Sequence, residues 1–130
     1  MSADDDARVI ELAGKIFDLA RNGDAAGLAS YVDAGVPVNL TNERGDTLLM
    51  LAAYYGHSDA VAVLLERGAD ANGPEDAGAT PLAGAVFKGD EKVVRLLLAA
   101  GADPDAGNPS ARDSATMFER TELLKFFSPS

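Results

Sequence analysis

Few side chains of this sequence could carry out acid–base or nucleophilic chemistry. His57 is the only histidine, and a hydrolase that paired it with a carboxylate would still need a nucleophile in reach. The chain has no cysteine, so thiolate catalysis, disulfides and cysteine-based metal sites are excluded, and one histidine cannot form a paired zinc site. We therefore expect that the protein is not an enzyme.

Two further patterns contain residue types that bind ligands in other proteins. Asp103, Asp105 and Asn108 have the spacing Asp-x-Asp-x-x-Asn, which is similar to the start of a calcium-binding loop. Such a loop needs a bidentate glutamate at its twelfth position, where this chain has Ser114. The glycine-rich stretch 73–78 lacks the lysine of a phosphate-binding loop, and we interpret it as a turn. We expect neither a metal ion nor a cofactor.

The composition indicates a helical, globular and acidic protein. Alanine and leucine are abundant, which favours helix, and 130 residues suggest one domain. The net charge of −10 opposes binding to nucleic acids and to anionic membranes. No apolar run approaches the roughly 20 residues of a transmembrane helix, and the acidic N-terminus does not resemble a secretory signal. We expect a cytoplasmic protein, with which the lack of cysteine is consistent.

A period of 33 residues runs through most of the chain. Its clearest members are two sets of glycines at this spacing: Gly23, Gly56 and Gly89, and Gly35, Gly68 and Gly101. The runs 63–70 and 96–103, VLLERGAD and LLLAAGAD, are similar and have the same spacing. Because four such periods nearly fill the chain, we expect a stack of about four similar units.

Each unit has the sequence signals of two helices. Thr47 is a suitable N-cap for the apolar run 48–53, and a second helix with one apolar face then continues to Gly68. In the next unit Thr80 is the N-cap, and Pro81 stands at the first helical position, where its missing N–H is harmless. The leucines that we expect on the buried face of the second helices are Leu64, Leu65, Leu97 and Leu98.

These units resemble the ankyrin repeat. The strings GDTLLMLAAYYGH (45–57), GATPL (78–82) and LLERGADAN (64–72) are similar to the family pattern. That pattern is G-x-T-P-L-H-x-A-A-x-x-G-H, followed by a second helix that ends L-L-x-x-G-A-D-x-N. The resemblance implies an all-α solenoid of about four helix-turn-helix units, with atypical capping units at the two ends.

The resemblance also assigns individual positions. The family often has Gly-His where this chain has Gly56-His57, so we expect His57 to be a turn residue. Met50 and Ala83 stand where the family usually has a histidine, and we expect the hydrogen bonds of that histidine to be lost. Leu48 replaces the usual proline.

We predict one domain, 1–130, with units close to 6–38, 39–71, 72–104 and 105–127 and with tails 1–5 and 128–130. The first helix is expected to begin near Asp6, and Asp24 is expected to cap the second helix of that unit. The last unit lacks three residues. We place the deletion in the turn around Asn108, but a deletion between the two helices of this unit fits the sequence as well.

In the family, the turn tips and the exposed side of the first helices form a concave surface that binds partners. By register, the positions of this surface that the repeat does not fix include Arg21, Asn22, Glu43, Ala77 and Ala79, joined in the fourth unit by Met117 and Phe118. The members that we predict to bind the partner are Arg44, Asp46, Tyr54, Tyr55, Asp76, Phe87 and Lys88. Tyrosine is enriched at interface hot spots, so the aromatic residues favour a binding role. The alternative is that their rings pack on neighbouring units.

The resemblance therefore implies a non-catalytic module that binds another protein through its concave face. The acidic charge favours a basic partner. One more specific hypothesis is an inhibitor or immunity-type protein that blocks a basic toxin or enzyme. Another is a stabiliser of a redox enzyme such as catalase, because the chain looks like small stand-alone bacterial ankyrin-repeat proteins, some of which are encoded beside such enzymes. We expect a monomer that binds neither nucleic acid nor membrane.

Overall fold

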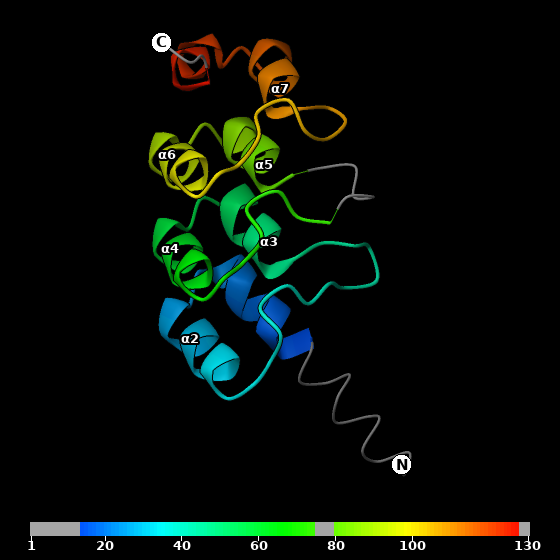
Figure 1. Cartoon of the computed structure of the whole chain (residues 1–130), viewed down its shortest axis with the longest axis vertical. Helices are drawn as coiled ribbons and strands as arrows, with labels where there is room; N and C mark the ends of the chain where they lie inside the picture. Colours follow the sequence, from blue (N-terminus) through cyan, green and yellow to red (C-terminus); the bar gives the residue numbers. More distant parts are fainter. Residues whose placement is uncertain (1–13, 75–79, 128–130) are drawn as a thin grey trace.

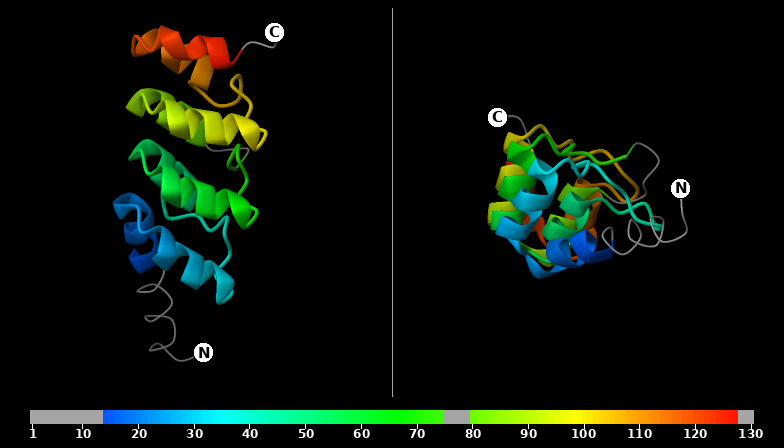
Figure 2. Two further views of the ribbon diagram at one scale, coloured as in Figure 1. Left: turned by 90° about the vertical axis from the view of Figure 1, so that its left-hand side faces the viewer. Right: turned by 90° about the horizontal axis from the view of Figure 1, so that it is seen from below.

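Helix pairs stacked in one column form the architecture of this protein (Figure 1). The computed structural model describes residues 14–74 and 80–127. In Figure 1, α2, α4 and α6 form one layer and α3, α5 and α7 form the other, with the longer loops beyond the second layer. Seen along the stack in Figure 2, the helices of successive units lie over one another. The all-α stack predicted from the sequence is confirmed.

The helical segment 14–22 comes first in the described chain, and the elements that follow it have these bounds: α2 (Ala25–Asp33), α3 (Leu48–Tyr54), α4 (Ser58–Glu66), α5 (Pro81–Lys88), α6 (Glu91–Ala99), α7 (Ala111–Met117) and the 3₁₀ helix η1 (Thr121–Phe126). The predicted helix start near Asp6 and the predicted tails lie outside the described residues. Among the described residues, no helix is long and apolar enough to cross a membrane.

Side-chain caps explain where the helices begin. The Thr47 hydroxyl accepts the Met50 backbone N–H at 3.1 Å, and Thr80 caps α5 in the same way. Pro81 is the first residue of α5, and Asp24 caps α2, as the sequence predicts. Each cap satisfies one of the backbone donors that have no partner at a helix start.

Met50, which stands where the family usually has a histidine, makes a hydrogen bond with its own side chain. Its sulfur accepts the Thr47 backbone N–H at 3.4 Å, while Thr47 accepts the Met50 N–H, so the two residues form a reciprocal capping box. The position at α3 therefore keeps one side-chain hydrogen bond of its own, although a thioether is a weak acceptor. At α5 the equivalent Ala83 has no polar side-chain atom, and only Thr80 makes a cap bond.

The three-residue deletion of the last unit lies in the turn before α7. Ser110 accepts the Asp113 backbone N–H at 3.1 Å and so takes the capping role of Thr80 at a spacing of 30 residues. The preceding turn residues Asp70 and Asp103 keep the full spacing of 33, and each donates its N–H to an asparagine one unit earlier. The deletion therefore falls between Asp103 and Ser110, where the sequence analysis placed it.

The last helix differs in kind from the expected one. Residues Thr121–Phe126 form a 3₁₀ helix instead of the expected α-helix. No side chain caps the start of this segment at Arg120, whereas Ser110 caps α7, and short 3₁₀ pieces are frequent where the α-helical pattern is not anchored. The segment still buries Leu123 and Phe127, whereas Phe126 is only partly buried.

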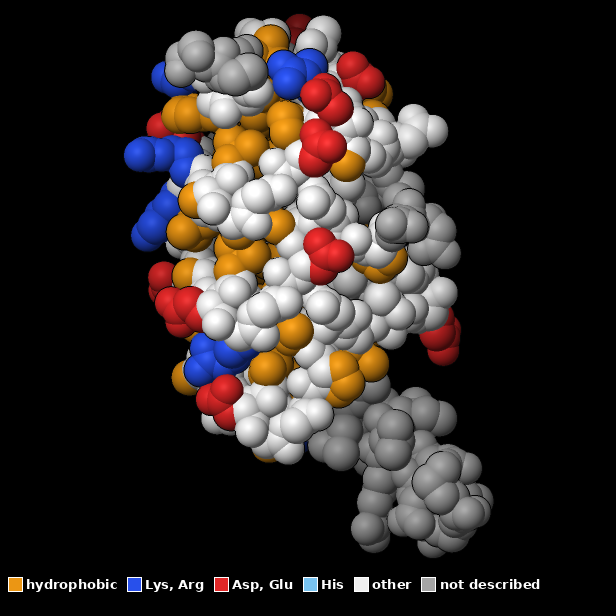
Figure 3. Space-filling view, viewed as in Figure 1, with side chains coloured by type: hydrophobic (Ala, Val, Ile, Leu, Met, Phe, Trp, Pro, Cys, Tyr) orange, Lys and Arg blue, Asp and Glu red, His pale blue; other side chains and the backbone are white. Residues whose placement is uncertain are grey.

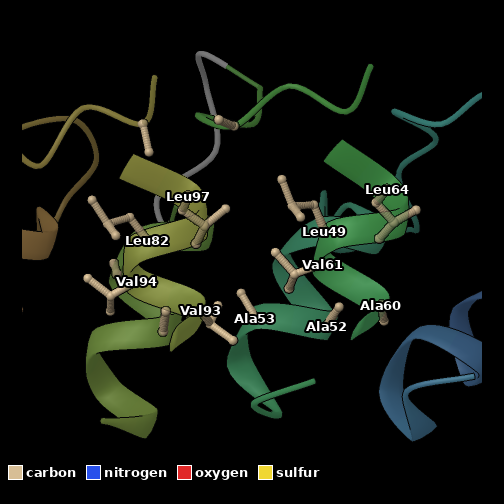
Figure 4. Packing of buried hydrophobic residues seen from close by; sticks show 14 of the residues in the cluster. Leu49, Ala52, Ala53, Ala60, Val61, Leu64, Leu82, Val93, Val94 and Leu97 are labelled. Atoms are coloured by element: carbon tan, nitrogen blue, oxygen red, sulfur yellow. The ribbon is translucent and has the colours of Figure 1, made fainter. Parts of the chain in front are cut away.

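Small and aliphatic side chains fill the space between the two helix layers. Figure 4 shows the same arrangement in two neighbouring units, whose fully buried residues include Leu49, Val61 and Leu64 in one and Leu82, Val94 and Leu97 in the next. Leu65 and Leu98, which we expected on the same buried face, are only partly buried, because adjacent helical residues point about 100° apart. On the face shown in Figure 3, hydrophobic side chains form a column between the two layers.

His57 links the first two units, in agreement with its expected structural role. Its ring Nε2–H donates to the Arg21 carbonyl oxygen at 2.7 Å. The ring also lies directly over Gly23, where a Cβ atom would be 2.6 Å from it and where φ is +75°. Only glycine satisfies both the left-handed backbone and this close approach.

Glu119 stands at the equivalent turn position of the last unit, in a left-handed conformation with φ of 58°. We expect Glu119→Gly to raise the free energy of unfolding by about 0.5–1 kcal/mol, because this conformation strains every residue with a Cβ atom. A urea titration measures the difference. Glu122→Gly, inside η1, is the matched control and is expected to lower stability. Equal effects of the two substitutions would contradict this account.

An exposed ion pair joins α2 to α4. Arg67 donates from Nε to Asp33 Oδ1 at 2.9 Å and from Nη2 to Oδ2 at 3.2 Å. This hydrogen bonding by Arg67, aided by its positive charge, holds the pKa of Asp33 below its ordinary value. Because the pKa is lower in the folded than in the unfolded chain, the contribution of Asp33 to stability is complete above about pH 4 to 5 and is lost as the pH falls through the lowered value.

We therefore expect Asp33→Asn to unfold at a slightly lower temperature than the wild type at pH 7, and this difference to shrink in acid. Thermal unfolding at pH 7 and at about pH 2 to 3 is the measurement. Glu43→Gln, at an exposed position of the loop before α3 and away from any helix start, is the control and should leave the pH dependence unchanged. A deficit of Asp33→Asn that stayed constant over this range would contradict the assignment.

Candidate functional site

The ends of α3 and α5 bring together three of the predicted partner-binding residues. Tyr54 and Phe87 stack with ring centroids 5.3 Å apart and an angle of 7° between the ring planes. Tyr55 meets Tyr54 edge-on at 5.2 Å. The exposed fractions of Tyr54, Tyr55 and Phe87 are 44%, 45% and 41%. The rings thus pack on their neighbours and are open to solvent at the same time.

Phe118 extends this cluster into the last unit. Its ring meets that of Phe87 at 4.8 Å and 90°, and 41% of the residue is exposed. We refer to Tyr54, Tyr55, Phe87 and Phe118 as the aromatic row. Met117, 62% exposed, precedes Phe118 at the end of α7. Within the described part of the chain, the row and Met117 are the exposed large hydrophobic side chains.

The polar members of the predicted set lie in two places. Lys88 is exposed beside Phe87, and its Cε would be 3.2 Å from a Cβ atom placed on Gly56. Arg44 and Asp46 lie in the loop before α3, at the opposite end of that helix from Tyr54, where both backbone N–H groups donate to Asn42 Oδ1. Only Lys88 of these three is therefore next to the row.

Arg44 lines a surface hollow of about 680 Å³ together with Phe17 and Arg21 of the segment 14–22. Asp76 lies outside the described residues.

The residues of the calcium-like pattern have structural partners. Asp103 accepts the Asp105 backbone N–H at 2.9 Å. Asp105 pairs with Arg112 at 2.7 Å, and this hydrogen bond lowers the pKa of Asp105. Within the described ranges, no group of three or more His, Asp or Glu side chains is arranged to hold a metal ion.

Two asparagines that link neighbouring units were missed in the sequence. Asn39 Oδ1 accepts the Asp70 backbone N–H at 2.8 Å, and Asn72 Oδ1 accepts the Asp103 N–H at 2.7 Å. The sequence contains a signal for these contacts, because Asn39 and Asn72 are 33 residues apart, which is the repeat period. An asparagine that recurs at the repeat period in a turn is a candidate for contact with the next unit.

Arg120 is a second residue that the sequence did not single out. The carbon of its guanidinium group would be 3.0 Å from a Cβ atom placed on Gly89, so the side chain packs against the turn between α5 and α6. Its Nε is buried and has no hydrogen-bond partner among the described residues. Arg120 thus brings a positive charge to the turn that follows Phe87 and Lys88.

Comparison with known proteins agrees with this architecture. A family model described as ankyrin repeats (3 copies) matches residues 16–108, most of the chain. An ankyrin repeat protein of Pseudomonas aeruginosa is 46% identical over 56 residues, which are 43% of this chain and 33% of the relative. The matched part is therefore about a third of that relative's length. With its repeat period, its capped helix pairs and the family match, this chain belongs to the ankyrin-repeat family.

Proposed function

We propose that this protein is a non-catalytic module that binds a partner protein through the aromatic row. Ankyrin repeats generally mediate protein–protein interaction. The observation that carries the proposal is the gathering of the exposed large hydrophobic side chains of the described chain at the ends of α3, α5 and α7. The apolar area of this patch is exposed to water. Burial of that area under a partner would stabilise the complex through the hydrophobic effect.

The packing of the rings favours them as binding anchors. Tyr54 and Phe87 restrain each other by stacking, and Phe118 contacts Phe87 at right angles. Side chains that are ordered before binding lose less conformational entropy when the partner arrives. Aromatic rings also provide a large contact area with few rotatable bonds.

The net charge of the chain is a second feature that we expect to act in partner binding. The net charge of −10 favours encounter with a basic partner and makes the association rate sensitive to salt. We also include four polar residues in the proposed surface. Lys88 lies next to the row, Arg44 and Asp46 lie in the loop before α3, and Asp76 belongs to the predicted set. We also propose that the protein is monomeric and cytoplasmic.

Both specific hypotheses use this same surface. An inhibitor or immunity-type protein would reduce the activity of a basic toxin or enzyme in proportion to its occupancy. A stabiliser of a redox enzyme would instead lengthen the lifetime of that enzyme under heating. Activity and thermal inactivation of the partner, measured with and without excess of this chain, separate the two hypotheses.

The test compares affinity capture and cross-linking by the wild type with those by Tyr54→Ala and Phe87→Ala. We expect each substitution to weaken partner binding by about 2 kcal/mol, or about 30-fold in Kd, because it removes an interface anchor. Glu66→Ala is the control, since Glu66 is an exposed residue at the end of α4. A partner that bound both ring variants as tightly as the wild type would refute the proposed surface.

A further inference from the structure

The spacing of the aromatic row matches a feature of the α-helix. Tyr54, Phe87 and Phe118 come from α3, α5 and α7 or their ends, which are stacked along the long axis in Figures 1 and 2. Successive ring centroids are 5.3 and 4.8 Å apart. One turn of an α-helix rises by about 5.4 Å. A helix lying along the row would therefore offer about one side chain per turn to each successive ring.

Positive charge borders the row on the side of the turn between α5 and α6. Lys88 is exposed, and Arg120 packs on Gly89 with its Nε buried and unpartnered among the described residues. One oxygen of the nearby Asp90 carboxylate, Oδ1, accepts the Val93 backbone N–H at 3.1 Å, and the other, Oδ2, lies beside Gly56 on the same side as the Lys88 side chain. No salt bridge to Arg120 occurs within the described ranges. The buried Nε of Arg120 is out of reach of a ligand, but a carboxylate on a docked partner would be attracted by the two positive charges at this edge of the row.

The ring geometry disfavours a cation at the centre of the row. A cation–π contact needs a free aromatic face. Tyr54 and Phe87 stack almost parallel, at 7°, so each covers one face of the other. Aliphatic side chains, which can pack against ring edges as well as faces, suit the row better than lysine or arginine.

We propose that the docked part of the partner is an amphipathic α-helix. Its apolar stripe lies along Tyr54, Phe87 and Phe118, and its flank carries an aspartate or glutamate opposite Arg120 and Lys88. The inference rests on the proposed function, since it states the kind of partner that the same surface takes. The contact thus selects a carboxylate locally, although the net charge of the whole chain is negative.

The probe is a displayed library of random peptides of about 16 residues, which is about four helical turns. The full chain is the target, and the Tyr54→Ala/Phe87→Ala variant removes peptides that bind elsewhere. We expect the selected peptides to share apolar residues at i, i+3 or i+4, and i+7, with Asp or Glu beside them. A proline in the middle of such a peptide should abolish binding, because it breaks the helix.

Variants of the full chain test the carboxylate contact. We expect Arg120→Gln to weaken binding of a selected peptide by about 5- to 10-fold and to reduce its salt dependence. Arg95→Gln is the matched control, because Arg95 is exposed on α6, and it should change the affinity by less than about twofold.

The outcomes separate this inference from the proposed function. Selected peptides that need the aromatic row but tolerate a central proline, or that carry Lys or Arg at the flank, overturn the inference and leave the proposed function in place. Equal effects of Arg120→Gln and Arg95→Gln overturn it as well. A library that yields no peptide dependent on the row contradicts both.

Discussion

Leu64→Ala is expected to lower the free energy of unfolding by about 2–5 kcal/mol, because it leaves a cavity in a packed core. Leu64 is fully buried in α4, and Leu97 holds the same position one unit later. A loss of this size is a large part of the 5–15 kcal/mol that typically stabilises a domain. Because each solenoid unit contacts only its neighbours, few other contacts compensate for it.

Two neighbouring substitutions make this test specific, and urea titrations of all three variants provide the comparison. Leu65→Ala removes the same atoms from the adjacent, partly buried position and should cost clearly less. Tyr55→Ala, at a position that is 45% exposed, should stay within about 1 kcal/mol of the wild type. An unchanged stability of Leu64→Ala would show that the assigned core register is wrong.

Deletion of residues from Ser110 onward is expected to remove most of the stability and to make the protein associate. The deleted part buries Leu123 and Phe127 at 2% and 5% exposure, and α7 packs on α5. Burial of a large apolar side chain contributes about 1.5–3 kcal/mol, so these two residues alone account for a substantial part of a small domain's stability. The uncovered faces of α5 and α6 would be apolar and exposed.

Urea titration and size-exclusion chromatography with light scattering measure these two effects. Glu122→Ala in the full chain is the control, because Glu122 is exposed in η1, and it should leave both properties unchanged. A truncated chain that stays monomeric and equally stable would show that α7 and η1 do not cap the stack. The deletion also removes Phe118, so we expect it to weaken partner binding by the proposed surface as well.

The sequence alone determined the local features of this fold. The 33-residue period, the caps at Thr47 and Thr80 and the buried position of Leu64 all follow from patterns within one unit. Helical hydrogen bonds and caps join residues a few positions apart, so residue type and spacing are enough to predict them. The exposed positions of Tyr54 and Phe87 follow by the same reasoning, because register assigns both to the end of a first helix.

Only the tertiary structure decided which side chains meet between units. The contact of Phe118 with Phe87, the bond from His57 to the Arg21 carbonyl and the packing of Arg120 on Gly89 each join residues more than 30 positions apart in the chain. Such contacts depend on the distance and angle between stacked helices and on how far each side chain reaches, and no pattern within a single unit encodes these quantities. The period shows that Tyr54 and Phe87 are equivalent and that Tyr55 and Phe118 hold the next position of their units, but only the stacking shows that these four rings form one continuous row.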